Sequence, residues 1–543
     1  MLPLFIFIGR VFYLQIIKSE QFSLLADKQH RFYYKIPPQR GRIYDRKMRE
    51  LAVSFNVSSC YANPRKIKDK QGAADKLAVF FDLDSDKVLR LLRKDKAFVW
   101  IKRYISEENA KGLDELGIGA LGLIKESKRF YPDQILASHI LGFVGIDNDG
   151  LEGLELYYND YLKGAAGLTI ISRDAKGRRI ESKEQLISSP MDGYDIILTI
   201  DKYIQHIAER ELEAVYKKYK AKAAIIIIMD PSTGEILAMA NRPTFNPNSF
   251  AKSSSDARRN RAVCDIFEPG SVFKIVTAAG ALEEGIISPE DKIYCENGAY
   301  RIHRHTLHDH KPYKELTFKE VIKYSSNIGT VKVAQRLKKD MLYQYIKHFG
   351  FGNVTGIDLP LEENGIIRPP EQWSKISISA IPMGQEIAVT ALQMLRAMSA
   401  VANEGRLVRP HLVKRITDKR DECLKEFKPE RGPRIFGEKT SSQLKEILAA
   451  VVEGGTGKRA KVKGYTAAGK TGTAQKVSPK GGYSRGKFIA VFAGFLPVEN
   501  PKIAMIVVVD EPRPVYYGGH VSAPVFKAAA QEVLNYIENS GLN

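Results

Sequence analysis

The chain has 543 residues, of which 44% are hydrophobic and 27% charged, and a formal net charge of +20 at pH 7. This length predicts at least two domains, and this composition is typical of a globular protein. Four cysteines without any C-x-x-C spacing exclude a zinc ribbon and a disulfide-dense scaffold. The basic residues are spread without a nucleic-acid motif, which indicates solvated basic faces, with attraction to anionic lipid or cell-wall polymer as the alternative.

Residues 1–17 form an apolar run, MLPLFIFIGRVFYLQII, interrupted by Arg10 and Gln15. A membrane-spanning helix needs about 20 apolar residues. The run also lacks the basic leader and the small-residue cleavage site of a signal peptide. We interpret it as the outer part of a membrane helix that begins upstream of residue 1. A buried amphipathic helix is the alternative.

Residues 18 to about 190 are basic, polar and irregular, and they contain no catalytic constellation. Stretches rich in arginine, carboxylates and glycine occur at 40–46 (RGRIYDR), 129–132 (RFYP) and 150–155 (GLEGLE). Because arginine and carboxylate side chains form strong bidentate pairs, these stretches are predicted to hold an elongated module together.

From about residue 191 the pattern predicts an α+β domain. A short strand at 196–200 is followed by a helix that Asp201 caps and that runs to about Tyr219. Further predicted elements are strand pairs at 223–230 with 235–240 and at 488–496 with 503–510, and a final helix at 524–538. Strand pairs at both ends with helices between them indicate one antiparallel sheet packed by helices.

Ser271 and Lys274 form an S-x-x-K pattern at the start of a predicted helix over 272–284, which Gly285 ends. Because the two residues are three positions apart on a helix, the lysine amine can reach the serine hydroxyl. Serine becomes a nucleophile when a base takes its proton, and a lysine is such a base only when neutral, which burial and a second cation such as Lys470 favour. The pattern predicts a nucleophile and its base; a helix cap and a surface lysine are the ordinary alternative.

Ser325 and Asn327 form an S-x-N pattern after a short predicted helix with a capping box at Thr317 and Glu320. A hydroxyl at such a helix-to-loop junction can relay a proton, and an amide can bind a peptide carbonyl. We therefore expect this junction to face a cleft.

The run Lys470-Thr471-Gly472-Thr473 occurs once, in a strand of small residues. A lysine charge and two hydroxyls suit a terminal carboxylate, and Gly472 is predicted to let a substrate backbone approach closely. Attack on a carbonyl creates an oxyanion, for which the backbone N–H groups of Ser271 and Thr473 are the predicted donors.

Residues 303–310 read HRHTLHDH, with His303, His305, His308, Asp309 and His310. Imidazole and carboxylate are zinc ligands, so a metal site is one interpretation. Because nothing in the sequence links this cluster to the serine motifs, an exposed polar loop is favoured, and no metal or cofactor is predicted.

The three motifs occur in order and match the S-x-x-K, S-x-N and K-T-G set of enzymes that acylate a serine. With them, the chain resembles the class B penicillin-binding proteins, and within these the division-specific peptidoglycan transpeptidase of the FtsI type. The resemblance extends over nearly the whole chain and includes the phrases DIFEPGS (265–271), CENG (295–298), GQEIAVTALQM (384–394) and KTGTAQK (470–476).

The resemblance implies an anchor at 1–17, a pedestal or dimerisation-type domain at 18–190 and a penicillin-binding transpeptidase domain at 191–543, the last on the extracytoplasmic side of the plasma membrane. It implies that Ser271 is acylated by the D-alanyl-D-alanine end of a stem peptide, passes the acyl group to an amine of a neighbouring stem, and reacts with β-lactams as substrate mimics. The implied roles are base for Lys274, proton relay for Ser325, substrate amide contact for Asn327, and carboxylate site for Lys470, Thr471 and Thr473.

Septal cell-wall cross-linking is the implied function, with a glycosyltransferase of the SEDS family (FtsW type), other divisome proteins and the membrane as partners. An elongation- or sporulation-type transpeptidase of the same class is one alternative. A carboxypeptidase or β-lactamase is another, and a non-catalytic β-lactam sensor or divisome scaffold is a third.

Overall fold

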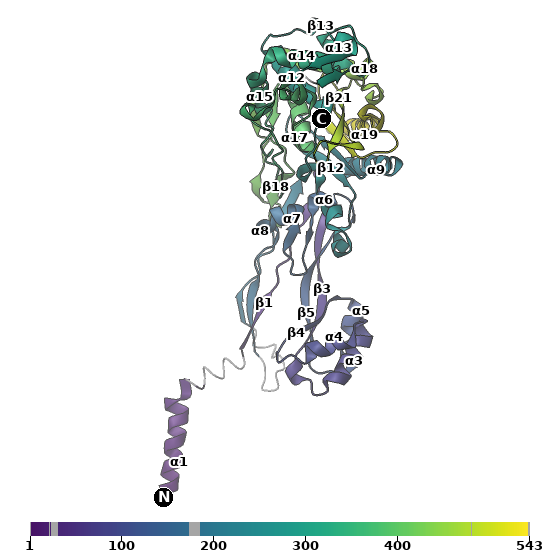
Figure 1. Ribbon diagram of the computed structural model, residues 1–543. Helices are drawn as coiled ribbons and strands as arrows, with labels where there is room; N and C mark the ends of the chain where they lie inside the picture. The colour runs from purple at the N-terminus through teal and green to yellow at the C-terminus, as the bar shows by residue number, and fades with distance from the viewer. Residues whose placement is uncertain are drawn as a thin grey trace.

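The computed structural model of the chain describes residues 2–20, 22, 31–172, 185–303, 305–478 and 481–540. The molecule is elongated (Figure 1), with α1 (Leu2–Phe12) at one end, a strand-rich pedestal in the middle and a larger head at the other end. After α1 the chain continues as a π-helix at Tyr13–Ile17, and apolar side chains such as Phe5 and Ile6 are exposed. Within the described ranges, no helix is both long enough and apolar enough to cross a membrane.

The main sheet of the pedestal joins strands from distant parts of the chain. Its order is β19–β18–β10–β2–β3–β4, and β5 also pairs with β3. The bounds are β2 (Ile43–Tyr44), β3 (Glu50–Ala62), β4 (Val99–Ile105), β5 (Leu121–Phe130), β10 (Asp195–Leu198), β18 (Val413–Thr417) and β19 (Cys423–Glu426). Residues 413–426, from the second half of the sequence, thus lie in the pedestal sheet through antiparallel pairing with β10.

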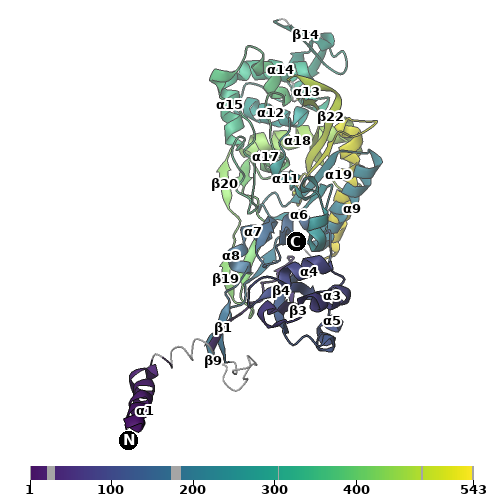
Figure 2. The ribbon, with the colours of Figure 1, turned by 60° about the horizontal axis from the view of Figure 1, so that its bottom comes forward.

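Smaller elements complete the pedestal. A three-stranded sheet comprises β1 (Arg31–Ile36), β8 (Gly167–Ser172) and β9 (Gln185–Ser188). A helical lobe beside β3 and β4 contains α3 (Lys70–Phe81), α4 (Ser85–Leu92) and α5 (Glu107–Lys111), and it has its own apolar core (Figure 2). Near the head lie α6 (Ser138–Leu141), β6 (Phe143–Val144), β7 (Gly150–Glu152), α7 (Gly153–Tyr157) and α8 (Asn159–Leu162).

A buried ion cluster connects the three stretches that the sequence singled out in this region. Arg40 Nε donates to Glu155 Oε2 at 2.6 Å, and Arg129 Nε donates to Glu155 Oε1 at 2.6 Å. The Tyr131 hydroxyl donates to Glu155 Oε1 at 3.2 Å. Burial alone would raise the pKa of Glu155, but the charges of Arg129 and Arg40 hold it below its ordinary value. The predicted arginine–carboxylate pairing is confirmed.

We expect Arg40→Lys to lower the free energy of unfolding by about 1–3 kcal/mol, because lysine keeps the charge but loses the rigid fork. The guanidinium of Arg40 donates four hydrogen bonds, two to Glu155, one to Asn148 O and one to Asn159 Oδ1. Urea denaturation measures the change. Arg65→Lys, at an arginine paired with exposed Asp95, is the matched control and should change the value by less than about 0.5 kcal/mol. Equal effects of the two substitutions would contradict this account.

The head contains the predicted antiparallel sheet, in the order β12–β11–β23–β22–β21. Its strands are β11 (Ala223–Met229), β12 (Ile236–Arg242), β21 (Ala468–Val477), β22 (Tyr483–Leu496) and β23 (Ile503–Asp510). Alternate residues of β11 point to opposite faces: Ile226 belongs to the core under α9 (Lys202–Lys218) and α19 (Gly518–Asn539), and Ile227 belongs to the core on the other face. The prediction of one antiparallel sheet packed by helices is therefore confirmed.

The second face of this sheet carries the larger set of helices (Figure 1). These are α12 (Lys274–Glu283), α13 (Phe318–Lys323), α14 (Asn327–Leu337), α15 (Lys339–His348), α17 (Ala391–Ala402) and α18 (Glu438–Gly454). The capping box predicted at Thr317 and Glu320 is present at the start of α13. Asp201 caps α9 as predicted, since its side chain accepts from the N–H groups of Tyr203 and Ile204.

The last helix, α19, begins at Gly518, six residues before the predicted start, so Pro524 lies inside it. Proline has no N–H, and the carbonyl four residues earlier, on His520, accepts a hydrogen bond from the Tyr219 hydroxyl at 3.4 Å instead. At the other end of α19, the Tyr536 hydroxyl donates to Asp201 Oδ2 at 3.0 Å and accepts from Lys47 Nζ of the pedestal at 2.8 Å. The helix therefore extends from the pedestal joint to the active-site side of the sheet.

Candidate active site

Four segments bring the predicted motifs together at the β21 edge of the head sheet. They are the 3₁₀-helix η6 (Gly270–Phe273), which leads into α12, the start of α14, strand β21, and the hairpin β14 (Ala299–Ile302)–β15 (His305–His308). The labels α12, α14 and β21 lie close together in Figure 1, with β21 ending the five-stranded order.

The turn that carries Ser271 is packed directly against β21. A Cβ on Gly472 would lie 2.7 Å from Pro269 O and 2.8 Å from Val272 Cγ2, so only glycine fits there. Gly472 was predicted to let a substrate backbone approach closely. In the structure, the segment that approaches Gly472 closely is the turn at η6. Ser271 is half-buried, and its Oγ has no hydrogen-bond partner within the described part of the chain. The hydroxyl is therefore free to meet a substrate carbonyl.

Lys274 is completely buried one turn after Ser271. Four oxygens lie within hydrogen-bond distance of its Nζ and share its N–H groups: Ser325 O at 2.8 Å, Asn327 Oδ1 at 2.9 Å, Ser326 O at 3.1 Å and Ser325 Oγ at 3.3 Å. The S-x-x-K and S-x-N motifs are thus in direct contact, as the sequence predicted for a shared site.

Ser325 occupies the centre of the three motifs. Lys470 Nζ, also completely buried, donates to Ser325 Oγ at 2.9 Å. A hydroxyl has two acceptor positions and one O–H, so when Lys274 and Lys470 fill both acceptor positions the O–H is left to donate outward. Ser325 has a left-handed backbone with φ of 61°. This conformation typically costs about 1–3 kcal/mol at a non-glycine residue and is often found at functional sites.

The two buried lysines have lowered pKa values. Burial lowers the pKa of Lys274 to about 7, although the charge of Asp309 opposes the shift. Burial holds the pKa of Lys470 well below its ordinary value, and the charge of Lys274 lowers it further. From the sequence, burial and the charge of Lys470 were both expected to keep Lys274 neutral; in the structure burial lowers the pKa of Lys274, and the charge that acts on it is that of Asp309, which raises it. A neutral Lys274 is what a general base requires.

We expect the rate of penicillin acylation to rise with pH through about 7, because Lys274 accepts a proton only after losing its own. The second-order rate of labelling by a fluorescent penicillin, measured across pH, tests this. His310→Gln is the control, because His310 is the nearby histidine whose pKa both lysines influence, and the step should survive its removal. A rate that is flat through pH 7 would contradict the assignment of the base.

The remaining predicted residues have partners within the protein. Asn327 accepts from Lys274 Nζ at its Oδ1 and donates from Nδ2 to His308 O at 3.0 Å, so in the free protein it orients the lysine. Thr471 Oγ1 donates to Thr456 Oγ1 at 2.8 Å. Thr473 Oγ1 accepts from Gly518 N, at the first turn of α19, at 3.1 Å. Their contacts with substrate stay predictions.

Asp309 is a site residue that the sequence analysis missed. Its Oδ2 accepts from Ser326 Oγ at 2.6 Å, and its Oδ1 accepts from Asn327 N at 2.5 Å and from Ile328 N at 3.1 Å. A carboxylate at this position stabilises the N-terminus of α14. The hairpin was expected to be unconnected to the serine motifs, and that expectation was wrong.

The histidines of the same hairpin do not form a metal site in the described ranges. No group of three or more histidine, cysteine or acidic side chains is placed there to hold an ion. His305 and His308 are exposed on β15, and His310 packs edge-on against Tyr517 with ring centroids 6.3 Å apart. Partial burial and the charges of Lys274 and Lys470 lower the pKa of His310. The role of Asp309 could not be predicted from local sequence, because its partners lie 17 and more residues further along the chain.

We expect Asp309→Asn to slow acylation about tenfold, equivalent to ~1.4 kcal/mol, because an amide replaces a charged acceptor that positions Ser326 and Asn327. Loss of the carboxylate also removes the charge that raises the pKa of Lys274, so the pH step should move below 7. Rates of penicillin labelling across pH measure both changes. Asp291→Asn, at an exposed loop aspartate that accepts from Ser288 N, is the control and should leave both unchanged. If Asp309→Asn keeps the normal labelling rate and the pH step does not move, Asp309 does not position Ser326 and Asn327 for the reaction.

The arrangement provides the parts of serine acyl transfer. Ser271 supplies a free hydroxyl, Lys274 a buried base, and Ser325 a hydroxyl that can pass a proton to a leaving group. The N–H of Ser271 lies in the first turn of η6, where backbone N–H groups lack intrahelical partners. Thr473 lies on β21, at the edge of the sheet. These two N–H groups remain the predicted oxyanion donors.

Two protein families match the chain. The family described as penicillin binding protein transpeptidase domain matches residues 224–531, and the penicillin-binding protein dimerisation domain matches residues 35–198. The first family covers most of the head and contains all three motifs, and the second covers the pedestal.

Individual relatives extend the likeness over nearly the whole chain. Stage V sporulation protein D of Bacillus subtilis (strain 168) is 36% identical over 524 residues, which are 95% of this chain and 81% of that protein. Peptidoglycan D,D-transpeptidase FtsI of Escherichia coli (strain K12) is 33% identical over 543 residues, covering 98% of this chain and 90% of that protein. The crystal structure of penicillin binding protein 3 from Mycobacterium tuberculosis complexed with aztreonam has a TM-score of 0.72 at 27% identity, covering 93% of this chain and 97% of that chain.

Proposed function

The chain belongs to the class B penicillin-binding proteins and is a serine-type peptidoglycan D,D-transpeptidase, and from that premise we propose that Ser271 is its nucleophile and Lys274 its base. It is a target of β-lactams, which bind where the stem peptide binds. The observation that carries the residue assignment is the convergence of the Lys274 and Lys470 amines on Ser325 Oγ. One turn before Lys274 lies Ser271, which is half-buried and whose hydroxyl has no hydrogen-bond partner among the described residues.

In the proposed cycle, Ser271 Oγ attacks the carbonyl carbon of the penultimate D-alanine while its proton passes to Lys274. The N–H groups of Ser271 and Thr473 stabilise the oxyanion. The terminal D-alanine leaves with a proton delivered through the Ser325 hydroxyl, and a serine ester remains. An amine of a second stem peptide then attacks the ester, its proton returns through the same groups, and Ser271 is regenerated with a new peptide cross-link.

The assay for this cycle uses the purified protein, a donor stem pentapeptide and an acceptor amine. We expect stoichiometric release of D-alanine and formation of the cross-linked product. D-alanine release without cross-linked product at saturating acceptor would identify a carboxypeptidase instead. Rapid recovery of labelled penicillin as hydrolysed product would identify a β-lactamase.

We further propose that cross-linking by this protein occurs at the septum. Support comes from the phrases DIFEPGS, CENG and KTGTAQ, which resemble the division enzyme, and from the likeness to FtsI. A sporulation role is the second candidate, favoured by the 36% identity to stage V sporulation protein D. Depletion in the native organism should give filaments. Round cells would indicate elongation, and normal vegetative growth with defective spores would indicate sporulation.

The proposed location is the plasma membrane, with α1 as part of the anchor and the head on the extracytoplasmic side. The exposed apolar side chains of α1 support this proposal. A polymerase of the SEDS family (FtsW type) is the proposed partner, together with other divisome proteins. Extraction of the protein from membranes by alkaline carbonate would refute the anchor, and co-purification with the polymerase from detergent tests the partner.

A further inference from the structure

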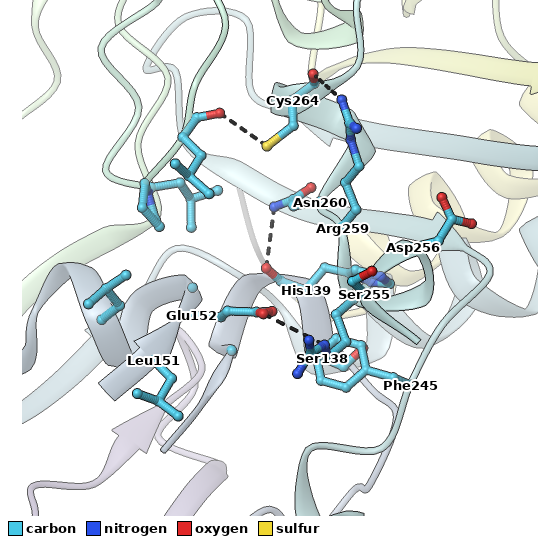
Figure 3. Close-up of a pocket in the computed structure, with 17 residues that line it drawn as sticks. Ser138, His139, Leu151, Glu152, Phe245, Ser255, Asp256, Arg259, Asn260 and Cys264 are labelled. Atoms are coloured by element: carbon cyan, nitrogen blue, oxygen red, sulfur yellow. Dashed lines mark hydrogen bonds and ion pairs between the residues drawn. The ribbon is translucent and has the colours of Figure 1, made fainter. Parts of the chain in front are cut away.

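A cavity of about 370 Å³ lies at the joint between the pedestal and the head, away from Ser271. In Figure 3, Leu151 and Glu152 line it from β7 of the pedestal, while Asn260 and Cys264 line it from the head. Its volume lies within the range of about 300–1,000 Å³ that is typical of small-molecule sites, and such sites are often found at domain joints.

The cavity presents one strong donor without an acceptor. Arg258 is held in place by Phe143, whose ring centroid lies 5.3 Å from the guanidinium carbon. Its Nε is buried and has no hydrogen-bond partner, and within the described part of the chain its guanidinium donates no hydrogen bond. The two terminal NH2 groups of the Arg258 guanidinium are therefore left to donate to an acceptor in the cavity that Arg258 lines.

The cavity also presents one strong acceptor without a donor. Glu152 Oε1 lies 3.7 Å from Arg258 Nε, which is an ion pair but too long for a hydrogen bond. No described residue donates a hydrogen bond to the Glu152 carboxylate. Burial raises the pKa of Glu152, although the charge of Arg258 lowers it in part. The two opposite charges are therefore neighbours that leave each other's hydrogen-bonding capacity unused.

The rest of the lining is largely apolar and partly exposed. Leu151 is 47% exposed, Leu156 is 41% exposed and Leu361 is 80% exposed, and they come from three different segments. Phe245 closes the inner wall and is almost completely buried. Covering such leucines with a ligand would remove apolar surface from water, which favours binding.

We propose that this cavity is a second ligand site, separate from the catalytic serine, and that it binds a small apolar zwitterion, such as a free amino acid with an apolar side chain. The carboxylate of the ligand accepts from Arg258, its ammonium group donates to Glu152, and its side chain packs on Leu151 and Leu156. A purely apolar ligand would leave Arg258 unsatisfied, and a simple anion would face Glu152 unpaired. Because Glu152 belongs to the pedestal and Arg258 to the head, the ligand bridges the two.

Cys264 provides a direct reporter of occupancy, because it lines the cavity and is a free thiol of intermediate exposure. The experiment measures alkylation of the full chain by iodoacetamide with peptide mass spectrometry, at near-neutral pH so that the ligand keeps its ammonium group, and over long reaction times because burial raises the pKa of the thiol to about 11. The exposed Cys423, on β19, is an internal control. With phenylalanine at ten times its Kd, alkylation of Cys264 should slow about tenfold while that of Cys423 stays constant.

Matched probes and variants test which groups of the ligand the cavity recognises. Phenylpropionate lacks the ammonium group and phenethylamine lacks the carboxylate, and both should protect Cys264 less than phenylalanine does. Arg258→Met and the nearly isosteric Glu152→Gln should each weaken protection at least about tenfold, as expected for loss of a charged hydrogen bond. Arg93→Met, at an exposed arginine of the pedestal, should leave it unchanged. No protection, equal protection by all three probes, or full protection in both cavity variants would overturn the proposal.

Discussion

Replacing Ser271 with alanine is expected to abolish covalent labelling by fluorescent penicillin and to reduce transpeptidation by a factor on the order of 10⁶. The acyl group has to be carried by an oxygen at the position where η6 meets β21, and an alanine there leaves no atom to form the ester. The adjacent lysines cannot substitute, because both amines are completely buried and directed at Ser325.

Labelling in gels and mass spectrometry of the intact protein measure this loss. Ser442→Ala is the matched control, because Ser442 and Lys445 repeat the S-x-x-K spacing on the exposed side of α18 and should be irrelevant to acylation. Thermal unfolding of both variants shows that the head is folded. Retention of the penicillin adduct in Ser271→Ala would refute the assignment of the nucleophile.

The second large effect is expected for Lys274→Met, which should slow acylation by about 10²–10⁴, the usual contribution of a positioned general base. Methionine fills a similar volume but cannot accept the Ser271 proton. It also leaves the carbonyls of Ser325 and Ser326 without their donor, so part of the loss is positional.

The pH profile separates these two causes. If Lys274 is the base, the residual activity of the methionine variant should show no step near pH 7, whereas a merely positional lysine would leave the step in place. Lys332→Met is the control, because Lys332 also donates hydrogen bonds within the head, to Tyr294 O and Glu296, but none at the site. A methionine variant that keeps both its rate and its pH step would exclude Lys274 as the base.

The helices and strands that could be predicted from the sequence are those whose local residue pattern agrees with their packing in the folded protein. The strand at 223–229 contains four consecutive isoleucines and lies inside the sheet, between β12 and β23. The helix from Lys274 has Ser271 in the turn before it and Gly285 after it. The start of α19 was misplaced because Pro524 is the stronger local signal, while the actual start depends on contact between Gly518 and β21.

The site residues that were predicted belong to short motifs whose residue types and spacing already indicate their chemistry. The residue that was missed comes near the site only when the chain folds. Asp309 reaches Ser326 only because a hairpin folds back over the start of α14. The lowered pKa of Lys274 was expected, but its main cause is burial, which no local pattern of the chain specifies. The entry of 413–426 into the pedestal sheet is a long-range pairing of the same kind.

Helix α19 has a mechanical consequence for the enzyme. It is 22 residues long, or about 33 Å, and its first turn holds Thr473 through the Gly518 N–H. Its last turns contact the pedestal, through Tyr536 with Lys47. A tilt of the pedestal relative to the head would therefore pull, through one rigid helix, on β21, the strand that carries Thr473.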